Sequence, residues 1–310
     1  MTKLKAIRAR SSRHASITYI RPSMQGTVSC KALYEQIYQA LWPAIGQARE
    51  CQAIAQQLLT HYCQLDPVHK VLDTPITLTP TQTQCLHTAL KRLNNHEPIQ
   101  YVLGEAPFLG RTFQVNPSVL IPRPETEALV QEIINENPPK DTCVLDLGTG
   151  SGCIAITLQL ALAQAKVWAL DIAPAALQTA RANAQRLGAQ VQWLQGDLLH
   201  DPLPKQRWHL IVSNPPYVRL AERAQMHRRV LAYEPAQALF VPDEQPLVFH
   251  AKIVALASQH LVPGGKLYLE INETMGDAVA SLLTQAGFAT VRIRQDLHDK
   301  DRWVVGTWRE

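Results

Sequence analysis

From Thr142 to the end of the chain, short apolar runs alternate with longer segments of helical periodicity. This alternation is typical of a parallel sheet, because strands buried on both faces are apolar throughout and need helical crossovers between them. It predicts strands near residues 142–147, 166–170, 191–194, 208–213, 266–271, 288–294 and 302–308, and helices near residues 152–163, 174–187, 245–261 and 276–286. No crossover helix precedes the seventh strand. We therefore expect it to insert antiparallel and to complete a doubly wound, seven-stranded α/β sheet.

The first predicted strand runs into a glycine-rich loop, Asp146-Leu-Gly-Thr-Gly-Ser-Gly152, and the loop opens a helix. Glycines let the chain turn sharply and let a ligand approach the backbone closely. The loop has neither the Gly-x-Gly-x-x-Gly spacing of dinucleotide sites nor the lysine of phosphate loops. With Asp146 beneath the turn, it suits a cofactor that carries positive charge and no phosphate, such as S-adenosylmethionine. The predicted cofactor-binding residues of the loop are Gly148, Thr149, Gly150, Ser151 and Gly152.

Acidic residues end the next two predicted strands. Asp171 ends the second, where a carboxylate can accept hydrogen bonds from both hydroxyls of a ribose. Gly196-Asp197-Leu198 ends the third, and we expect Asp197 to accept from an adenine amino group while Leu198 packs on the ring. Each aspartate alone is more typical of a helix cap or a turn. Their succession at strand ends after the glycine loop favours a cofactor site.

The fourth predicted strand ends abruptly in Ser213-Asn-Pro-Pro-Tyr217. Each proline fixes φ and removes a backbone donor, and Asn214 is held extended by the proline that follows it. In a doubly wound sheet the fourth strand lies beside the first, so this motif should face the glycine loop. The Asn214 carboxamide oxygen and the Pro215 carbonyl can together accept both hydrogens of one planar amino group, while Tyr217 covers its flat face. The predicted catalytic residues are Asn214, Pro215, Pro216 and Tyr217.

An amino group on an sp² carbon is a poor nucleophile because its lone pair is delocalised. Hydrogen bonds accepted from both of its hydrogens return electron density to the nitrogen and aim it at a sulfonium methyl group. Positioning of this kind accelerates transfer without a dedicated base, and the extra proton leaves to water. The predicted chemistry is therefore methyl transfer without a His or Cys nucleophile.

The chain before Thr142 divides into a helical region and a connector. Helices are expected near residues 34–42, 47–63, 66–73 and 81–95. Two short strands are expected at residues 108–115 and 119–121, around Asn116-Pro117, before a proline-restrained segment at residues 122–127 that leads into a helix. That segment suits either a plain connector or part of a site. The predicted domains are a basic, disordered extension (1–33), a helical domain (34–103), a β-hairpin with a connecting helix (104–141) and the sheet domain (142–310).

The charge of the chain is unevenly distributed. Residues 1–33 contain seven Lys or Arg and no acid, whereas the remainder holds 23 basic and 26 acidic residues, a net charge of −3. A net charge of −3 over the remainder of the chain argues against a protein that coats nucleic acid. The basic start suits a disordered extension, a stretch that precedes a true initiator at Met24, or an organelle transit peptide.

Cysteines, apolar residues and histidines indicate the cellular compartment and the absence of a membrane span or metal site. The six cysteines form no Cys-x-x-Cys pair, which favours a reducing cytoplasm over a disulfide-stapled fold. The apolar stretch from residue 153 to residue 170 is interrupted by Gln159, Gln164 and Lys166, so no membrane span is expected. The eleven histidines show no metal-ligand spacing, and we expect no metal site.

These motifs make the chain resemble the class I methyltransferases and, among them, the HemK/PrmC family that methylates the glutamine side chain of peptide chain release factors. The resemblance runs from about Tyr34 to the end of the chain. It is carried by Glu97-Pro-Ile-Gln-Tyr-Val-Leu-Gly104, Leu120-Ile-Pro-Arg-Pro-Glu-Thr-Glu127, residues 146–152, residues 213–217, Glu234-Pro235 and Asp301-Arg302. The chain departs from the family's usual pattern in residues 240–246 and 270–276.

The resemblance implies a class I methyltransferase domain and a helical amino-terminal domain that helps to dock the release factor. It also implies that Gly148 to Gly152, Asp171, Leu198 and Asn214 contact S-adenosylmethionine. Asn214 to Tyr217 would then hold the glutamine of a Gly-Gly-Gln loop. The expected protein is a cytoplasmic monomer that binds neither nucleic acid nor membrane.

Three alternatives remain open. A ribosomal-protein glutamine methyltransferase is disfavoured because the Ile-Pro-Arg-Pro-Glu-Thr-Glu segment and Asp301-Arg302 look more like the release-factor branch. A nucleic-acid amino methyltransferase would share Asn-Pro-Pro-Tyr, but the body charge of −3 and the lack of a basic, aromatic-laced face weigh against it. A cofactor-binding partner protein without catalysis is disfavoured by the intact residues 214–217.

Overall fold

The computed structural model of the chain describes residues 27–162 and 164–309. The described chain forms two compact units, which divide between His96 and Glu97. Residues 1–26 lie outside the described residues. They include most of the stretch predicted as a disordered extension or a transit peptide, and they include Met24.

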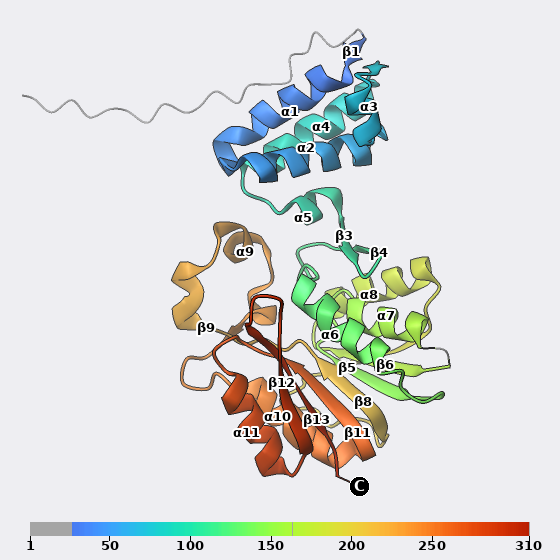
Figure 1. Cartoon of the computed structure of the whole chain (residues 1–310), viewed down its shortest axis with the longest axis vertical. Helices are drawn as coiled ribbons and strands as arrows, with labels where there is room; N and C mark the ends of the chain where they lie inside the picture. The colour runs from blue at the N-terminus through green and yellow to red at the C-terminus, as the bar shows by residue number, and fades with distance from the viewer. Residues whose placement is uncertain (1–26, 163, 310) are drawn as a thin grey trace, which may run out of the picture. The chain divides into compact units, whose positions relative to one another are not determined.

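Four described helices form the first unit (Figure 1): α1 (Cys30–Ile45), α2 (Ala48–Cys63), α3 (Pro67–Val71) and α4 (Pro80–Asn94). β1 (Val28–Ser29) pairs antiparallel with β2 (Pro75–Ile76). The prediction of a first helix at residues 34–42 is wrong at both ends. The Ser29 side chain accepts a hydrogen bond from the Ala32 N–H and starts α1 earlier. The helix also continues past Pro43, because burial of Leu33, Ile37 and Leu41 outweighs one missing hydrogen bond.

The second unit begins with a helix and a hairpin. α5 (Ile99–Leu103) precedes an antiparallel pair, β3 (Glu105–Phe108) and β4 (Arg111–Gln114), and α6 (Pro124–Asn135) follows. The prediction of strands at residues 108–115 and 119–121 is therefore wrong. Leu109 and Gly110 both have positive φ and turn the chain within the first of these ranges. Residues 119–121 form no strand in the described structure, and the Tyr101 hydroxyl donates to the Val119 carbonyl there at 2.6 Å.

A seven-stranded sheet forms the centre of the second unit, in the order β12-β13-β11-β8-β5-β6-β7 (Figure 1). Its strands are β5 (Cys143–Leu147), β6 (Lys166–Asp171), β7 (Val191–Gln195), β8 (Trp208–Ser213), β11 (Leu261–Glu270), β12 (Ala289–Gln295) and β13 (Asp301–Thr307). Within this described sheet, β13 alone runs in the direction opposite to the other strands. The predicted doubly wound sheet with an antiparallel last strand is confirmed. Since β8 pairs in parallel with β5, their carboxyl ends lie side by side.

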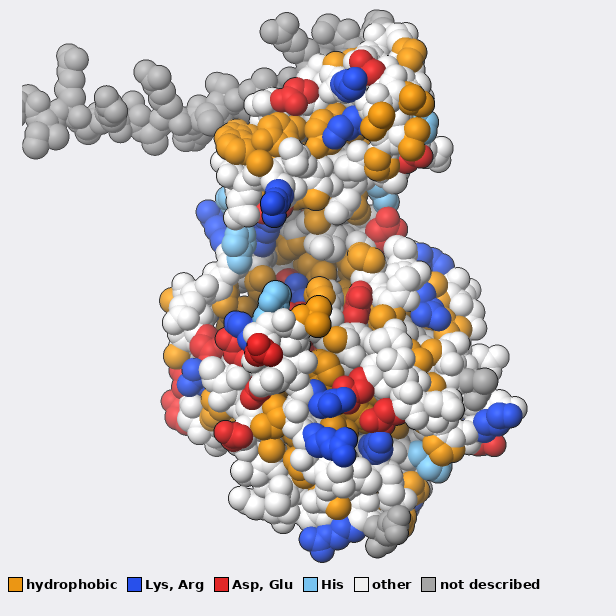
Figure 2. Space-filling model, viewed as in Figure 1, with side chains coloured by type: hydrophobic (Ala, Val, Ile, Leu, Met, Phe, Trp, Pro, Cys, Tyr) orange, Lys and Arg blue, Asp and Glu red, His pale blue; other side chains and the backbone are white. Residues whose placement is uncertain are grey.

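Helices cover both faces of this sheet (Figure 1). α7 (Cys153–Ala161), α8 (Pro174–Leu187), α10 (Val248–His260) and α11 (Gly276–Ala286) follow the predicted ranges closely. A segment that periodicity did not predict follows β8: β9 (Val218–Arg219) pairs with β10 (Phe240–Val241), and between them lie α9 (Arg228–Tyr233) and short 3-10 helices at Leu220–Gln225 and Ala236–Ala238. Acidic and basic side chains are interspersed on the face of this unit that Figure 2 shows.

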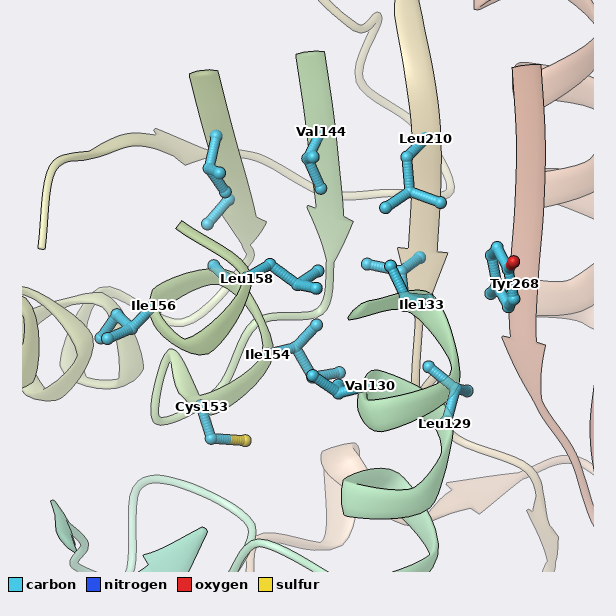
Figure 3. Close-up of a cluster of buried hydrophobic side chains, with 14 of the residues drawn as sticks. Leu129, Val130, Ile133, Val144, Cys153, Ile154, Ile156, Leu158, Leu210 and Tyr268 are labelled. Atoms are coloured by element: carbon cyan, nitrogen blue, oxygen red, sulfur yellow. The ribbon is translucent and has the colours of Figure 1, made fainter. Parts of the chain in front are cut away.

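Successive residues of each central strand enter different hydrophobic clusters. Val144 of β5 and Leu210 of β8 pack with Ile133 of α6 and Leu158 of α7 (Figure 3). The next residues, Leu145 and Ile211, belong to a second cluster that includes side chains of α10 and α11. Because both faces of β5 and β8 are packed in this way, the ends of these strands are held in fixed positions.

Candidate active site

A cavity of about 260 Å³ lies at the carboxyl ends of β5, β6, β7 and β8. Neighbouring parallel strands end at the same edge of a sheet, so the sheet brings the predicted motifs together there. The predicted site residues that line the cavity are Gly148, Thr149, Gly150, Ser151, Asp171, Asp197, Leu198, Asn214, Pro215 and Pro216. Gly152 and Tyr217 do not line it.

The glycine loop is hydrogen-bonded to the end of β6. The N–H groups of Gly148 and Thr149 both donate to the Leu170 carbonyl, at 2.8 and 3.0 Å. The Gly150 N–H donates to the Asp171 carboxylate at 2.8 Å. Gly150 has a φ of +53°, and a Cβ added there would meet no atom within 4 Å. The loop therefore presents backbone to open space, where a ligand can approach it closely.

Gly152 does not line the cavity, and its lack of a side chain permits close packing. Its φ is +80°, and an added Cβ would lie 2.9 Å from Ile156 Cδ1 and 3.1 Å from the Cβ of Ala180. Ile156 belongs to α7 and Ala180 to α8. The glycine thus lets the first turn of α7 pack closely against neighbouring side chains, which differs from the role in ligand approach that the sequence predicted.

Asp146 lies beneath the loop and is fully buried. One carboxylate oxygen accepts from the Thr149 hydroxyl at 2.6 Å and from the Ala155 N–H at 3.2 Å, which connects the loop to α7. The other oxygen has no partner among the described residues. Burial raises the pKa of Asp146 to about 7, against the lowering effect of these hydrogen bonds.

The two strand-end aspartates have different surroundings. Asp171 is buried, and besides the Gly150 N–H it accepts from the Ala173 N–H at 2.9 Å. Burial raises its pKa. Both oxygens of Asp197 contact its own turn, one accepting from the Leu199 N–H and the other lying 2.8 Å from His200 Nδ1. The hydrogen bond from His200 lowers the pKa of Asp197.

The Asn-Pro-Pro-Tyr motif is joined to a buried carboxylate. Asn214 Nδ2 donates to the Thr126 hydroxyl at 3.1 Å, and that hydroxyl donates to Glu270 Oε2 at 2.6 Å. The Tyr217 hydroxyl donates to Glu270 Oε1 at 3.0 Å. Glu270 is fully buried, and burial raises its pKa to about 7, while burial and the neighbouring Glu270 charge raise the pKa of Tyr217 well above its ordinary value.

Thr126 and Glu270 were not predicted as site residues. Thr126 lies within the proline-restrained segment at the start of α6, and Glu270 is the last residue of β11. A signal for Glu270 did exist, because an acid that ends a strand adjacent and parallel to β8 falls at the same edge of the sheet as the Asn-Pro-Pro-Tyr motif. The strand order, which periodicity alone does not give, was needed to use it.

An ion pair holds the proline-restrained segment in place. Arg123, which lines the cavity, donates to Glu234 Oε1 at 2.6 Å. Glu234 Oε2 accepts from the Ile121 N–H at 3.2 Å, and the Glu234 side chain is 1% exposed. The Glu-Pro and Pro-Arg-Pro segments are therefore held together by this ion pair and hydrogen bond.

Among the described residues no group of His, Cys, Asp and Glu could hold a metal ion. None of the described helices has the length and apolar character that a membrane span requires.

Two family models match the chain: the PrmC N-terminal domain at residues 35–104 and the methyltransferase small domain at residues 124–240. Among solved structures, a methyltransferase from Pyrococcus furiosus is similar with a TM-score of 0.48 at 18% identity, covering 65% of this chain and 91% of that one. A release factor glutamine methyltransferase from Flavobacterium psychrophilum is 40% identical over 278 residues, 88% of this chain and 97% of the relative. One from Bacteroides thetaiotaomicron is 41% identical over 272 residues, 87% of this chain and 96% of the relative.

Proposed function

The chain belongs to the release factor glutamine methyltransferase family, and from that premise we propose that it methylates the side-chain amide nitrogen of a release-factor glutamine, using S-adenosylmethionine. We propose the glutamine of the Gly-Gly-Gln motif as the acceptor. The observation that carries the proposal is the meeting of the glycine loop and the Asn214 carboxamide in one cavity.

The residues of the cavity fit S-adenosylmethionine. The backbone at Gly150 faces open space, and the Asp171 carboxylate lines the cavity. The basic side chain in the described lining, Arg123, is already paired with Glu234, so the lining suits a ligand without phosphate. When bound, the cofactor supplies a methyl group activated by a sulfonium centre. We assign cofactor contacts to Gly148, Thr149, Gly150, Ser151, Asp171, Asp197, Leu198 and Asn214, with Gly152 supporting the loop from behind.

The acceptor amide would be held by Asn214 and the two prolines. The Asn214 carboxamide oxygen and the Pro215 carbonyl each accept one hydrogen of the glutamine NH₂, which returns electron density to the nitrogen. Pro215 and Pro216 restrict the backbone and keep both acceptors in place. Tyr217 flanks the amide, and the proton released after transfer passes to water. Positioning accounts for the acceleration without a general base.

The remaining expectations concern partners and setting. We propose that the helical domain of residues 34–103, which the PrmC N-terminal domain model matches at residues 35–104, docks the release factor. All six cysteines are free thiols, which suits a reducing cytoplasm. We also propose a monomer without direct nucleic-acid binding, for which the mixed charge of the face in Figure 2 gives support. Light scattering and a nucleic-acid titration test these two points.

The function is tested by offering the protein separate acceptors. The chain is incubated with S-adenosylmethionine and a release factor, a ribosomal-protein pool or DNA, and any methyl group is located by mass spectrometry. We expect methylation of one release-factor glutamine. Methyl on a ribosomal protein or a base would support the corresponding alternative, and its absence from every acceptor would support a cofactor-binding partner protein.

The role of Asn214 is tested by Asn214→Ala. We expect kcat to fall about 100- to 1,000-fold, as when one preorganised polar group is removed from an active site. The Kd for S-adenosylmethionine, measured by calorimetry, should change only a few-fold because the loop and Asp171 remain. Unchanged turnover would show that this role is misassigned.

A further inference from the structure

We propose that Thr126 and Glu270 are positioning residues that fix which end of the Asn214 carboxamide faces the acceptor nitrogen. The inference rests on the proposed function and extends it to two residues that are hydrogen-bonded to the Asn-Pro-Pro-Tyr motif, of which Thr126 also lines the cavity. It follows from the direction in which each hydrogen bond of this network must run.

The network begins at Glu270, whose side chain is fully buried at the end of β11. Burial raises its pKa to about 7, so the ionised form, which has acceptors and no donor, prevails above neutral pH and is the form that fixes the direction of these hydrogen bonds. The Thr126 hydroxyl at 2.6 Å and the Tyr217 hydroxyl at 3.0 Å must therefore both donate to it. Each hydroxyl has a single hydrogen, so Glu270 uses the only donor that either side chain possesses.

The orientation of Asn214 follows from this. Thr126 has given its hydrogen to Glu270 and can only accept from Asn214, so the carboxamide must present Nδ2, as it does at 3.1 Å. Within the described residues the carboxamide makes no other hydrogen bond, and its oxygen is left available. Oxygen and nitrogen of an amide have nearly the same shape, so packing alone would not choose between the two orientations. The network makes this choice.

The reversed amide would fail twice. Its oxygen would face the lone pairs of Thr126, and its NH₂ would meet the NH₂ of the acceptor glutamine, donor against donor. The sheet makes the required arrangement reproducible, because β8 and β11 pair in parallel with Ser213 opposite Leu269. Asn214 and Glu270 are the next residues along these strands. The Ser213 hydroxyl also donates to the Leu147 carbonyl at 2.6 Å, which ties the end of β8 to β5.

The test removes one hydroxyl without changing the shape of the side chain. Thr126→Val should lower kcat on a release factor about 10- to 100-fold, the effect of losing one buried hydrogen bond that sets polarity. The Kd for S-adenosylmethionine should stay within about threefold of wild type, since the Thr126 methyl group and the glycine loop are kept. Thr126→Ser, which keeps the hydroxyl, should recover most of the lost kcat.

A matched control is available in the same unit. Thr157 of α7 is fully buried, and its hydroxyl has no hydrogen-bond partner among the described residues. Thr157→Val makes the same chemical change away from the cavity and should leave kcat at the wild-type value. Equal kcat for Thr126→Val and Thr157→Val would overturn the inference. Loss of kcat in both Thr126→Val and Thr126→Ser would also overturn it, because the hydroxyl would then not be the cause.

Glu270→Met gives a second route if Thr126→Val does not fold. A thioether is only a weak acceptor, so the Thr126 hydroxyl is no longer committed to donate to position 270 and can donate to Asn214 instead. We expect kcat to fall at least tenfold while the Kd for S-adenosylmethionine is kept; wild-type kcat would overturn the inference. Failure of the proposed function is distinguishable, because wild type itself would then methylate no glutamine.

Discussion

Replacing Gly152 by alanine should destabilise the second unit through both backbone strain and packing. A φ of +80° costs an L-residue about 1–2 kcal/mol. The added methyl group would lie 2.9 Å from Ile156 Cδ1 and 3.1 Å from the Cβ of Ala180. Overpacking of this kind adds about 1–3 kcal/mol. We therefore expect the free energy of unfolding to fall by about 2–5 kcal/mol.

Gly150→Ala is the matched control, because it makes the same substitution in the same loop. Gly150 also has positive φ, +53°, but an added Cβ meets no atom within 4 Å. Only the backbone cost of about 1–2 kcal/mol should appear. The difference between the two variants isolates the packing contribution.

Urea unfolding followed by tryptophan fluorescence measures this difference. Five of the six tryptophans lie in residues 97–310, so the signal reports mainly on the unit that contains the loop. The midpoint for Gly152→Ala should be clearly lower than that for Gly150→Ala. Coinciding midpoints would refute the reasoning from packing.

Cofactor binding should rank the two variants in the opposite order. The methyl group of Gly150→Ala would project into the space proposed for S-adenosylmethionine and weaken binding by about 5- to 100-fold. Gly152 does not line the cavity, so folded Gly152→Ala should lose less affinity by calorimetry. A larger loss for Gly152→Ala than for Gly150→Ala would contradict the assignment of these two glycines.

Two further changes test buried charges in the site. Burial raises the pKa of Asp146 from an ordinary value of 3.8 to about 7, so its stabilising contribution is complete below about pH 4 and is lost as pH rises through 7. Asp146→Asn should therefore gain stability relative to wild type between pH 5 and 8, by up to roughly 4 kcal/mol in urea unfolding, and a flat difference would contradict the pKa assignment. Arg123→Met leaves the buried Glu234 carboxylate without its cation and should cost about 1–3 kcal/mol, less than a fully buried pair because Arg123 is 32% exposed. Adding Glu234→Gln to that variant should restore part of the loss, and additive losses would count against a direct interaction.

The sheet and the two motifs were predictable because their signals are local. Apolar runs, helical periodicity and the prolines after Ser213 each act within a few residues, and the order of strands in a doubly wound sheet then places the glycine loop beside Asn214. The hairpin was misplaced for the opposite reason. Leu109 adopts positive φ there, and an apolar side chain such as leucine does not indicate a turn.

The support behind the motifs was not predictable from the sequence. Thr126 and Glu270 are 144 residues apart and meet only because α6 packs near the edge where β11 ends. Gly152 was predicted to admit a ligand, but its neighbours Ile156 and Ala180 come from two helices whose packing the pattern does not specify. Periodicity locates elements, whereas contacts between distant elements depend on how those elements pack.

The two halves of the site also differ in when they can form during synthesis. Apart from Asn214, the residues proposed for the cofactor come from one continuous stretch, from the end of β5 to the turn after β7, and these strands pair with each other. The acceptor side joins residues from α6, β8 and β11, and long-range contacts of that kind form late in folding. A nascent chain that has not yet been synthesised as far as Glu270 would lack the group that orients Asn214. The chain would therefore be able to bind the cofactor at an earlier stage of translation than it could orient an acceptor. Orientation of the acceptor would require nearly the full length of the chain.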